Sequence, residues 1–211
     1  MVRLNILPGV VVWRGRFSLR AQKQILQEVL ERLKEAPLYR PAMPKTGKAF
    51  SVEESNFGTL GWVSDISGYR YQNVHPLTGK PWPQIPDLLL SLWGEINEGR
   101  APECCLINLY RHGAKMGLHQ DLDEKDDSAA VIGVSLGDEA LFRIGTCTRG
   151  GKTRSFKLSS GDVLSFGGPA RLAYHGIDKI RPQTSELSLG GGRISLTLRR
   201  VAQQGLLAPL S

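Results

Sequence analysis

The chain of 211 residues is long enough for one domain with a sizeable hydrophobic core. Its hydrophobic content of 41% and charged content of 22% are those of a folded protein and exclude a disordered chain. No apolar run approaches the length of a membrane span, so we expect no membrane association. The formal net charge of +7 favours an anionic partner, most simply nucleic acid.

The three cysteines indicate a reducing compartment. Cys104 and Cys105 are adjacent and no Cys-x-x-Cys pair occurs, so the sequence has neither a disulfide framework nor zinc spacing. We expect all three to be reduced and buried, as is typical of a cytoplasmic protein. The segment from Leu4 to Pro8 is too short and broken for the core of a signal peptide.

A short buried strand and then a helix are predicted near the N-terminus. The strand covers residues 9–13, and Ser18 is a good N-cap for the helix that follows. Apolar residues then recur at helical spacing, which predicts a stripe that packs on a sheet: Ile25, Leu26, Val29, Leu30 and Leu33. Glu28 and Arg32 form an i,i+4 pair, and Pro37 is expected to end the helix.

Residues 39–82 combine many turn formers with aromatic and basic side chains, and two interpretations are open. Aromatic residues in such a segment can simply close the edge of a core. They can also form a lid that stacks bases while the cations hold phosphates. Tyr69 and Tyr71 would lie on one side of a strand, as a stacking platform needs.

The second half of the chain is predicted to be β-rich. A helix opens at Pro86 and closes by Gly99, and turn signals then follow about every ten residues. The expected strands are 104–110, 117–121, 131–136, 140–144, 154–158, 162–166, 171–175 and 193–199. This pattern favours a mostly β fold with flanking helices: a double-stranded β-helix, or cupin-like jelly roll. We expect a single domain over 1–211, with helices and a nucleotide-recognition lid in 1–100 and the catalytic core in 101–200.

A candidate metal site lies at His119-Gln120-Asp121. In extended backbone His119 and Asp121 point to the same face, and His175 could supply a third ligand. Two histidines and one carboxylate are the ligand set of non-haem iron oxygenases, which leaves about three positions on the ion open. A His-x-Asp pair alone is common on protein surfaces, so the pair needs support from the rest of the chain.

Two strands alternate between apolar and polar side chains. In 104–110, Cys105, Ile107 and Leu109 form the apolar face; in 193–199 the polar face carries Arg193, Ser195, Thr197 and Arg199. Such a face is often simply exposed to solvent. If it points into the barrel, each arginine needs an anion, because an unpaired buried charge is very costly. A dicarboxylate would satisfy both guanidinium groups.

Together these residues resemble the AlkB family of iron(II)- and 2-oxoglutarate-dependent dioxygenases, in particular its bacterial DNA-repair demethylases. The resemblance extends from about Pro8 to Arg200. It depends on these strings: Asn108-x-Tyr110, His119-x-Asp121, Ser160-Gly161-Asp162-Val163, Tyr174-His175-Gly176-Ile177, Arg193-x-Ser195-x-Thr197-x-Arg199, Leu60-Gly61-Trp62 and Lys80-Pro81-Trp82-Pro83. Ser195 departs from the asparagine of the family motif, which bears on co-substrate affinity and not on activity.

The resemblance implies a role for each matching position. The Fe(II) ligands would be His119, Asp121 and His175. The co-substrate 2-oxoglutarate would be held by Asn108, Leu109, Tyr110, Arg193, Ser195, Thr197 and Arg199, with Asn108 and Arg199 at its 1-carboxylate end and Tyr110 and Arg193 at its distal carboxylate. The damaged nucleotide would contact Trp62, Tyr69, Tyr71, Asp123 and Arg149.

The implied reaction consumes dioxygen and oxidatively demethylates 1-methyladenine and 3-methylcytosine in DNA, releasing formaldehyde and succinate. The same chemistry on RNA or tRNA is one alternative, and a catalytically inactive jelly-roll nucleic-acid binder is another. We expect a monomer in the cytoplasm. His75 is expected to be solvated, His112 lies at a strand end, and neither is taken as a ligand. The charged residues 123–127 are expected to form a solvated loop, apart from Asp123.

Overall fold

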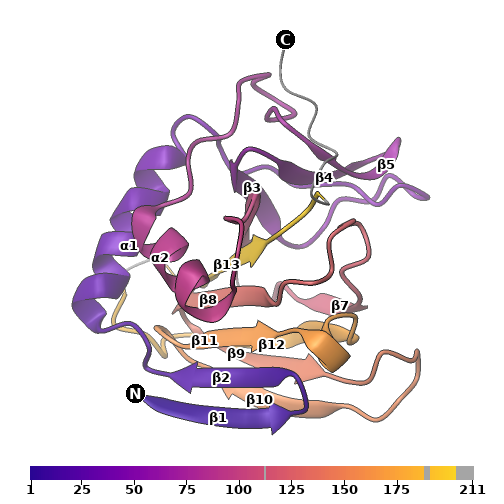
Figure 1. Cartoon of the computed structure of the whole chain (residues 1–211). Helices are drawn as coiled ribbons and strands as arrows, with labels where there is room; N and C mark the ends of the chain where they lie inside the picture. The colour runs from indigo at the N-terminus through magenta and orange to yellow at the C-terminus, as the bar shows by residue number, and fades with distance from the viewer. Residues whose placement is uncertain (112, 188–190, 203–211) are drawn as a thin grey trace.

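The computed structural model describes residues 1–111, 113–187 and 191–202. Within these ranges the chain is mostly β, with helices on one side (Figure 1). The helical elements are α1 (Leu19–Arg32), α2 (Asp87–Ile96) and a short 3-10 helix, η1 (Gly168–Ala170). The strands are β1 (Val2–Leu7), β2 (Val10–Arg14), β3 (Glu53–Gly58), β4 (Gly61–Asp65), β5 (Gly68–Gln72), β6 (Cys104–Tyr110), β7 (Met116–His119), β8 (Val131–Gly137), β9 (Glu139–Ile144), β10 (Arg154–Leu158), β11 (Val163–Phe166), β12 (His175–Arg181) and β13 (Arg193–Arg199).

Two antiparallel sheets form the body of the protein. The major sheet has the order β1-β2-β11-β8-β13-β6-β3, and the minor sheet has the order β10-β9-β12-β7. Apolar residues of both sheets pack in one cluster, in which Val131 and Phe166 of the major sheet meet Phe142 and Ile177 of the minor sheet. Sheets stacked face to face in this way form the predicted jelly roll, and the predicted fold class is confirmed.

The helices cover the outer face of the major sheet (Figure 1). Ser18 caps α1 as predicted, since its side chain accepts a hydrogen bond from the Ala21 amide. Ile25 and Val29 of α1 and Leu89 of α2 are completely buried against apolar residues of β6, β8 and β13. Burying the outer face of the sheet leaves its inner face free to carry polar side chains.

Most predicted elements of the β-rich half are confirmed, and strands β6, β10 and β13 have the predicted bounds. The predicted strand 171–175 is wrong, because η1 ends at Ala170, a turn and irregular backbone follow it, and β12 begins only at His175. Helix α1 ends at Arg32, before Pro37, and Leu30 is 49% exposed and not part of the buried stripe. The edge strand β1 was not predicted.

Strands from the first 60 residues belong to the major sheet. Strands β1 and β2 extend it on one side of β11, and β3 pairs with β6 on the other. The separate hairpin β4–β5 follows β3 and lies at one end of the two sheets (Figure 1). The division into a lid region and a core region stays a prediction, although this sheet takes strands from both halves of the chain.

Two expectations about single side chains are wrong. His75 is completely buried: its Nε2 lies 2.8 Å from the carbonyl oxygen of Pro37, and its Nδ1 accepts hydrogen bonds from two backbone amides. Cys147 is exposed, whereas Cys104 and Cys105 are buried thiols as expected. In the described part of the chain, no helix is both long and apolar enough to cross a membrane.

Candidate active site

The inner face of the major sheet is polar because two adjacent strands alternate strictly. On β13, Ile194, Leu196 and Leu198 pack under the helices, while the residues between them face the space between the sheets. On β6, Leu106, Asn108 and Tyr110 face the same space. The predicted inward face of β13 is therefore confirmed, and both of its arginines are buried.

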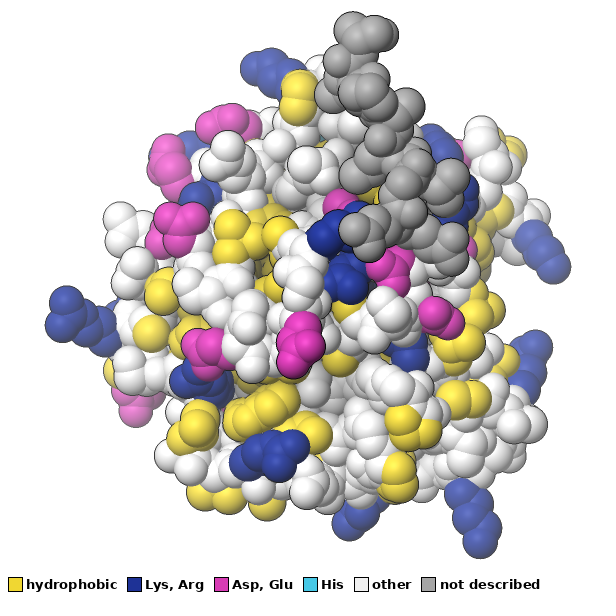
Figure 2. Space-filling view, viewed as in Figure 1, with side chains coloured by type: hydrophobic (Ala, Val, Ile, Leu, Met, Phe, Trp, Pro, Cys, Tyr) yellow, Lys and Arg dark blue, Asp and Glu magenta, His cyan; other side chains and the backbone are white. Residues whose placement is uncertain are grey.

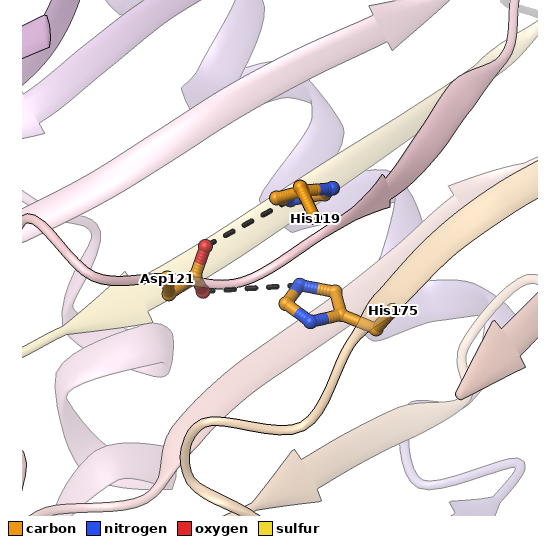
Figure 3. Close-up of side chains that lie close together, drawn as sticks. All are labelled: His119, Asp121 and His175. Carbon is orange, nitrogen blue, oxygen red and sulfur yellow. Dashed lines mark ion pairs between the residues drawn. The ribbon is translucent and has the colours of Figure 1, made fainter. Parts of the chain in front are cut away.

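Three candidate metal ligands lie close together, on β7, just after it and at the start of β12 (Figure 3). His119 and His175 lie directly opposite each other in the β7–β12 pair, with ring centroids 4.5 Å apart. Asp121 follows just after β7, and its carboxylate oxygens lie 3.8 Å from His119 Nε2 and 3.9 Å from His175 Nε2. One potential ligand atom from each residue lies within 4.8 Å of the other two.

The chemistry of this donor set fits a divalent metal ion. The Nδ1 atoms of both histidines lie 2.9 Å from backbone carbonyl oxygens, which leaves each Nε2 turned toward Asp121. Burial lowers the pKa of His175 to about 4, so that imidazole is neutral at pH 7 and can donate a lone pair. Oδ2 of Asp121 is buried and has no hydrogen-bond partner among the described residues. The triad could therefore hold Fe(II) with open positions.

A network of buried charges supports the metal carboxylate. Arg199 Nη2 donates a 2.9 Å hydrogen bond to Asp121 Oδ1, and Arg199 Nη1 lies 3.3 Å from Glu124. Arg171 lies 3.3 Å from the other oxygen of Glu124. Burial alone would raise the pKa of Asp121, but Arg199 and the two histidines lower it to about 2. The carboxylate is thus held ionised, as a metal ligand must be.

Polar side chains also form a row across the inner face of the major sheet. The strand register places Glu54, Asn108, Ser195 and Ser135 opposite one another on β3, β6, β13 and β8. Arg193 donates a 2.9 Å hydrogen bond to Ser135, while its Nε and Nη1 have no partner among the described residues. Asn108 Oδ1 is also buried and unpartnered in this part of the chain. Such groups are suited to a bound polar ligand, and Arg193 to a carboxylate.

The triad and the polar row share one cavity of about 440 Å³. Its outer wall includes Trp62 and Tyr69 of the β4–β5 hairpin, whose rings stack with centroids 5.5 Å apart and an interplanar angle of 20°. Trp62 Nε1 donates a 2.7 Å hydrogen bond to Asp123, two residues beyond the metal carboxylate. The indole is thereby fixed at the mouth of the cavity. The expected contact of Asp123 with the damaged nucleotide stays a prediction.

Three of the predicted site residues lie elsewhere. Leu109 points away from the cavity into the cluster under the helices, because the alternation of β6 turns it outward. Tyr71 does not line the cavity: its hydroxyl donates to Glu124 and lies 3.3 Å from Arg199. Arg149 lines a separate cavity of about 320 Å³ beside Thr146 and Thr148.

Sequence reasoning missed three buried charged residues of the site: Glu54, Glu124 and Arg171. Glu124 was expected in a solvated loop, yet its side chain is only 1% exposed. Strand β7 ends at His119, so the rule of alternating faces no longer applies there. Glu54 lies in a segment rich in turns, and only its pairing with β6 places it on the inner face. No local sequence signal marks Arg171.

Comparisons with known proteins agree with this geometry. Residues 9–199 match the 2OG-Fe(II) oxygenase superfamily. An α-ketoglutarate-dependent dioxygenase AlkB homolog of Caulobacter vibrioides is 50% identical over 200 residues, 93% of this chain and 90% of that protein. The DNA N(6)-methyladenine demethylase ALKBH1C of Arabidopsis thaliana is 30% identical over 226 residues, 92% of this chain and 49% of that protein.

Among solved structures, that of OsALKBH1 superposes with a TM-score of 0.83 at 29% identity. The superposition covers 94% of this chain and 100% of the OsALKBH1 chain. The His119–Asp121–His175 triad is suited to bind iron, and Arg193 on the inner face of the major sheet is suited to bind a carboxylate of 2-oxoglutarate. The chain therefore belongs to the AlkB family of iron(II)- and 2-oxoglutarate-dependent dioxygenases.

Proposed function

We propose that this dioxygenase removes methyl groups from the ring nitrogens of nucleic-acid bases, with alkylated DNA as the substrate. One observation carries the proposal: the indole of Trp62 is fixed at the mouth of the metal cavity by stacking on Tyr69 and by its bond to Asp123. A flat aromatic platform next to an oxidising centre suits a base that has been flipped out of its helix. The name of the Arabidopsis relative, a DNA N(6)-methyladenine demethylase, supports methylated DNA as the substrate, although it refers to a methyl group on an exocyclic nitrogen.

The roles proposed for the residues follow from their positions. His119, Asp121 and His175 hold the iron, and Arg199 keeps Asp121 ionised. Arg193, with its free donors, takes the distal carboxylate of 2-oxoglutarate, while Asn108 and Ser195 contact the same molecule from the polar row. When bound, iron with 2-oxoglutarate and dioxygen supplies the oxidation that converts an N-methyl group to N-hydroxymethyl, which releases formaldehyde.

The base is selected by how easily it leaves its pair and by the charge and shape of the residues around the cavity. Methylated adenine and cytosine pair poorly, so flipping them costs less than flipping an intact base. They also carry positive charge, which the face of Trp62 and the nearby carboxylates favour. In the view of Figure 2, which is that of Figure 1, lysine and arginine side chains project from the protein surface at several places rather than in one continuous patch. Such charges give a grip on phosphates that is independent of sequence and sensitive to salt.

Formaldehyde release from oligonucleotides containing 3-methylcytosine tests the proposal, with Fe(II) and 2-oxoglutarate added under oxygen. Release that depends on all three components is expected. A protein that binds the oligonucleotide and releases none would instead be the inactive binder. Matched DNA and RNA oligonucleotides decide between DNA repair and RNA demethylation, because stacking and phosphate contacts do not require deoxyribose. The cytoplasmic location and the monomeric state are part of the proposal.

A further inference from the structure

Glu54 is a buried carboxyl in the wall of the cavity with no role in the chemistry described so far. Glu54 is only 1% exposed, and its Oε2 makes no hydrogen bond with any described residue. A buried and unsatisfied carboxyl costs free energy, so a native site that keeps one has a use for it.

The position of Glu54 is that of a substrate contact rather than of a metal contact. The same cavity is lined by Met43, Phe50, Trp62 and Tyr69. Of its other carboxyls, Asp121 belongs to the triad, Glu124 is paired with Arg199 and Arg171, and Asp123 accepts the bond of Trp62. On the sheet Glu54 stands at the end of the polar row, next to Asn108. Glu54 therefore lies where the row that would hold the co-substrate meets the aromatic wall that would hold the base.

Glu54 also differs from Asp123, the other acid at this wall. Asp123 is exposed, and its Oδ2 already accepts the hydrogen bond of Trp62. Glu54 is shielded from water. In such a buried position the attraction between opposite charges is several times stronger than at the surface. A charge preference of the cavity would thus depend on Glu54 more than on Asp123.

We propose that Glu54 is a specificity-determining residue: its carboxyl binds the polar edge of a base held against Trp62 and favours positively charged N-alkylated bases over neutral ones. This inference rests on the proposed function. The carboxylate accepts a hydrogen bond from the exocyclic amine of the base and offsets its charge. A neutral base such as 3-methylthymine gains no such charge pairing.

The protonation of Glu54 gives the inference a second readout. Burial raises the pKa of Glu54 to about 8, and the charge of Arg199 opposes this only in part. The titratable groups that face it are Tyr39 from the preceding segment, Tyr110 of β6 and Arg199 of β13. The carboxyl is therefore mostly protonated at pH 7 in the free cavity. A cationic base favours the ionised form, so its binding releases a proton.

Glu54→Gln keeps the shape of the side chain and removes its charge, and Glu53→Gln is the matched control. Glu53 is the adjacent residue on β3, and its carboxylate pairs on the other side with Arg40 and Arg111, both at 3.3 Å. We expect E54Q to lower the ratio of kcat/KM for 3-methylcytosine to that for 3-methylthymine by about tenfold, mainly through KM. The E53Q variant should keep the wild-type ratio.

Calorimetric titration at pH 7, without oxygen and in two buffers of different ionisation enthalpy, counts the protons released on binding. The wild type should release close to one proton with the 3-methylcytosine oligonucleotide and none with the 3-methylthymine oligonucleotide. The E54Q variant should release none with either. If the wild type demethylates both bases and E54Q keeps the ratio and the proton count, the inference is wrong while the proposed function stands. If the wild type binds neither oligonucleotide, both fail.

Discussion

The two arginines at the ends of β13 lie on the same face of the strand but have opposite surroundings. Arg199 bonds to Asp121 and lies against Glu124, so its charge is balanced inside the protein, and its pKa is raised. Arg193 has one hydrogen bond, to Ser135, and burial lowers its pKa. Its nearest other partner is the ring of Tyr110, 5.5 Å from its guanidinium carbon.

This difference in pairing suggests different functions for Arg199 and Arg193. The alternation of β13 predicted that both arginines require an anion, which a dicarboxylate could supply to each. The structure meets the need of Arg199 with carboxylates of the chain itself. Among the described residues, Arg193 keeps both Nε and Nη1 without a partner, whereas Arg199 keeps only Nε. One end of the strand thus holds the metal carboxylate in place, and the other is ready for the co-substrate.

The largest expected effect comes from removing a metal ligand at the Arg199 end. His175→Ala should reduce bound iron to background and lower formaldehyde release by about 100-fold or more, because even partners outside the ligand set cost up to that much. Iron content after dialysis and single-turnover assays measure both. Unchanged release in this variant would contradict the assignment of His175. His75→Gln, at a buried histidine outside the triad, controls for general loss of folding.

Exchanging each arginine for methionine tests the contrast directly. Arg199→Met leaves Asp121 and Glu124 without their partner and should lower the free energy of unfolding by about 3–5 kcal/mol. Arg193→Met removes a charge that is poorly paired and should not destabilise the protein. It should instead raise the KM for 2-oxoglutarate by about 100-fold. Urea unfolding and co-substrate titrations make the measurements; equal destabilisation by both changes would erase the contrast.

A further effect concerns the pH dependence of stability at Glu54, the end of the polar row on β3. The pKa of Glu54 is raised from 4.5 to about 8. Below pH 4.5 the carboxyl is protonated in both the folded and the unfolded chain. Between 4.5 and 8 the unfolded chain ionises before the folded chain does, so stability is lost as pH rises. The Tm advantage of Glu54→Gln over wild type should therefore grow from pH 5 to pH 8; a constant difference would refute the raised pKa.

The smallest effect separates the two tyrosines of β5. Tyr71→Phe removes the hydroxyl that contacts Glu124 and Arg199, and should cost about 1 kcal/mol of stability with little change in the KM for the oligonucleotide. Tyr69→Ala removes the ring stacked on Trp62 and should raise that KM by about tenfold at unchanged stability, since Tyr69 is 51% exposed. The reverse pattern would show that Tyr71 is the substrate contact.

Short-range patterns were sufficient for the parts of this protein that repeat with a fixed period. The alternation of 104–110 and 193–199 determined which side chains share a face, and Ser18 determined where α1 begins. The metal triad could also be found, because His119 and Asp121 are two residues apart and His175 belongs to a family string. The alternation and the helix cap act between near neighbours in the chain, whereas His175 was found through the family resemblance and not through a local physical cause.

The parts that were not predicted depend on packing between distant segments. Glu124 and Arg171 are 47 residues apart, and their buried ion pair exists because η1 and the turn after β7 come together. The hydroxyl of Tyr71 donates to Glu124 and so joins that network, which the sequence did not predict. Glu54 faces the cavity because β3 pairs with β6.

The sequence by itself thus determined the ligand set, the family and the polar faces of the strands. Only the tertiary structure decided which buried charges are already paired. Charge pairing across a sheet depends on which strands become neighbours, and no local pattern encodes that choice.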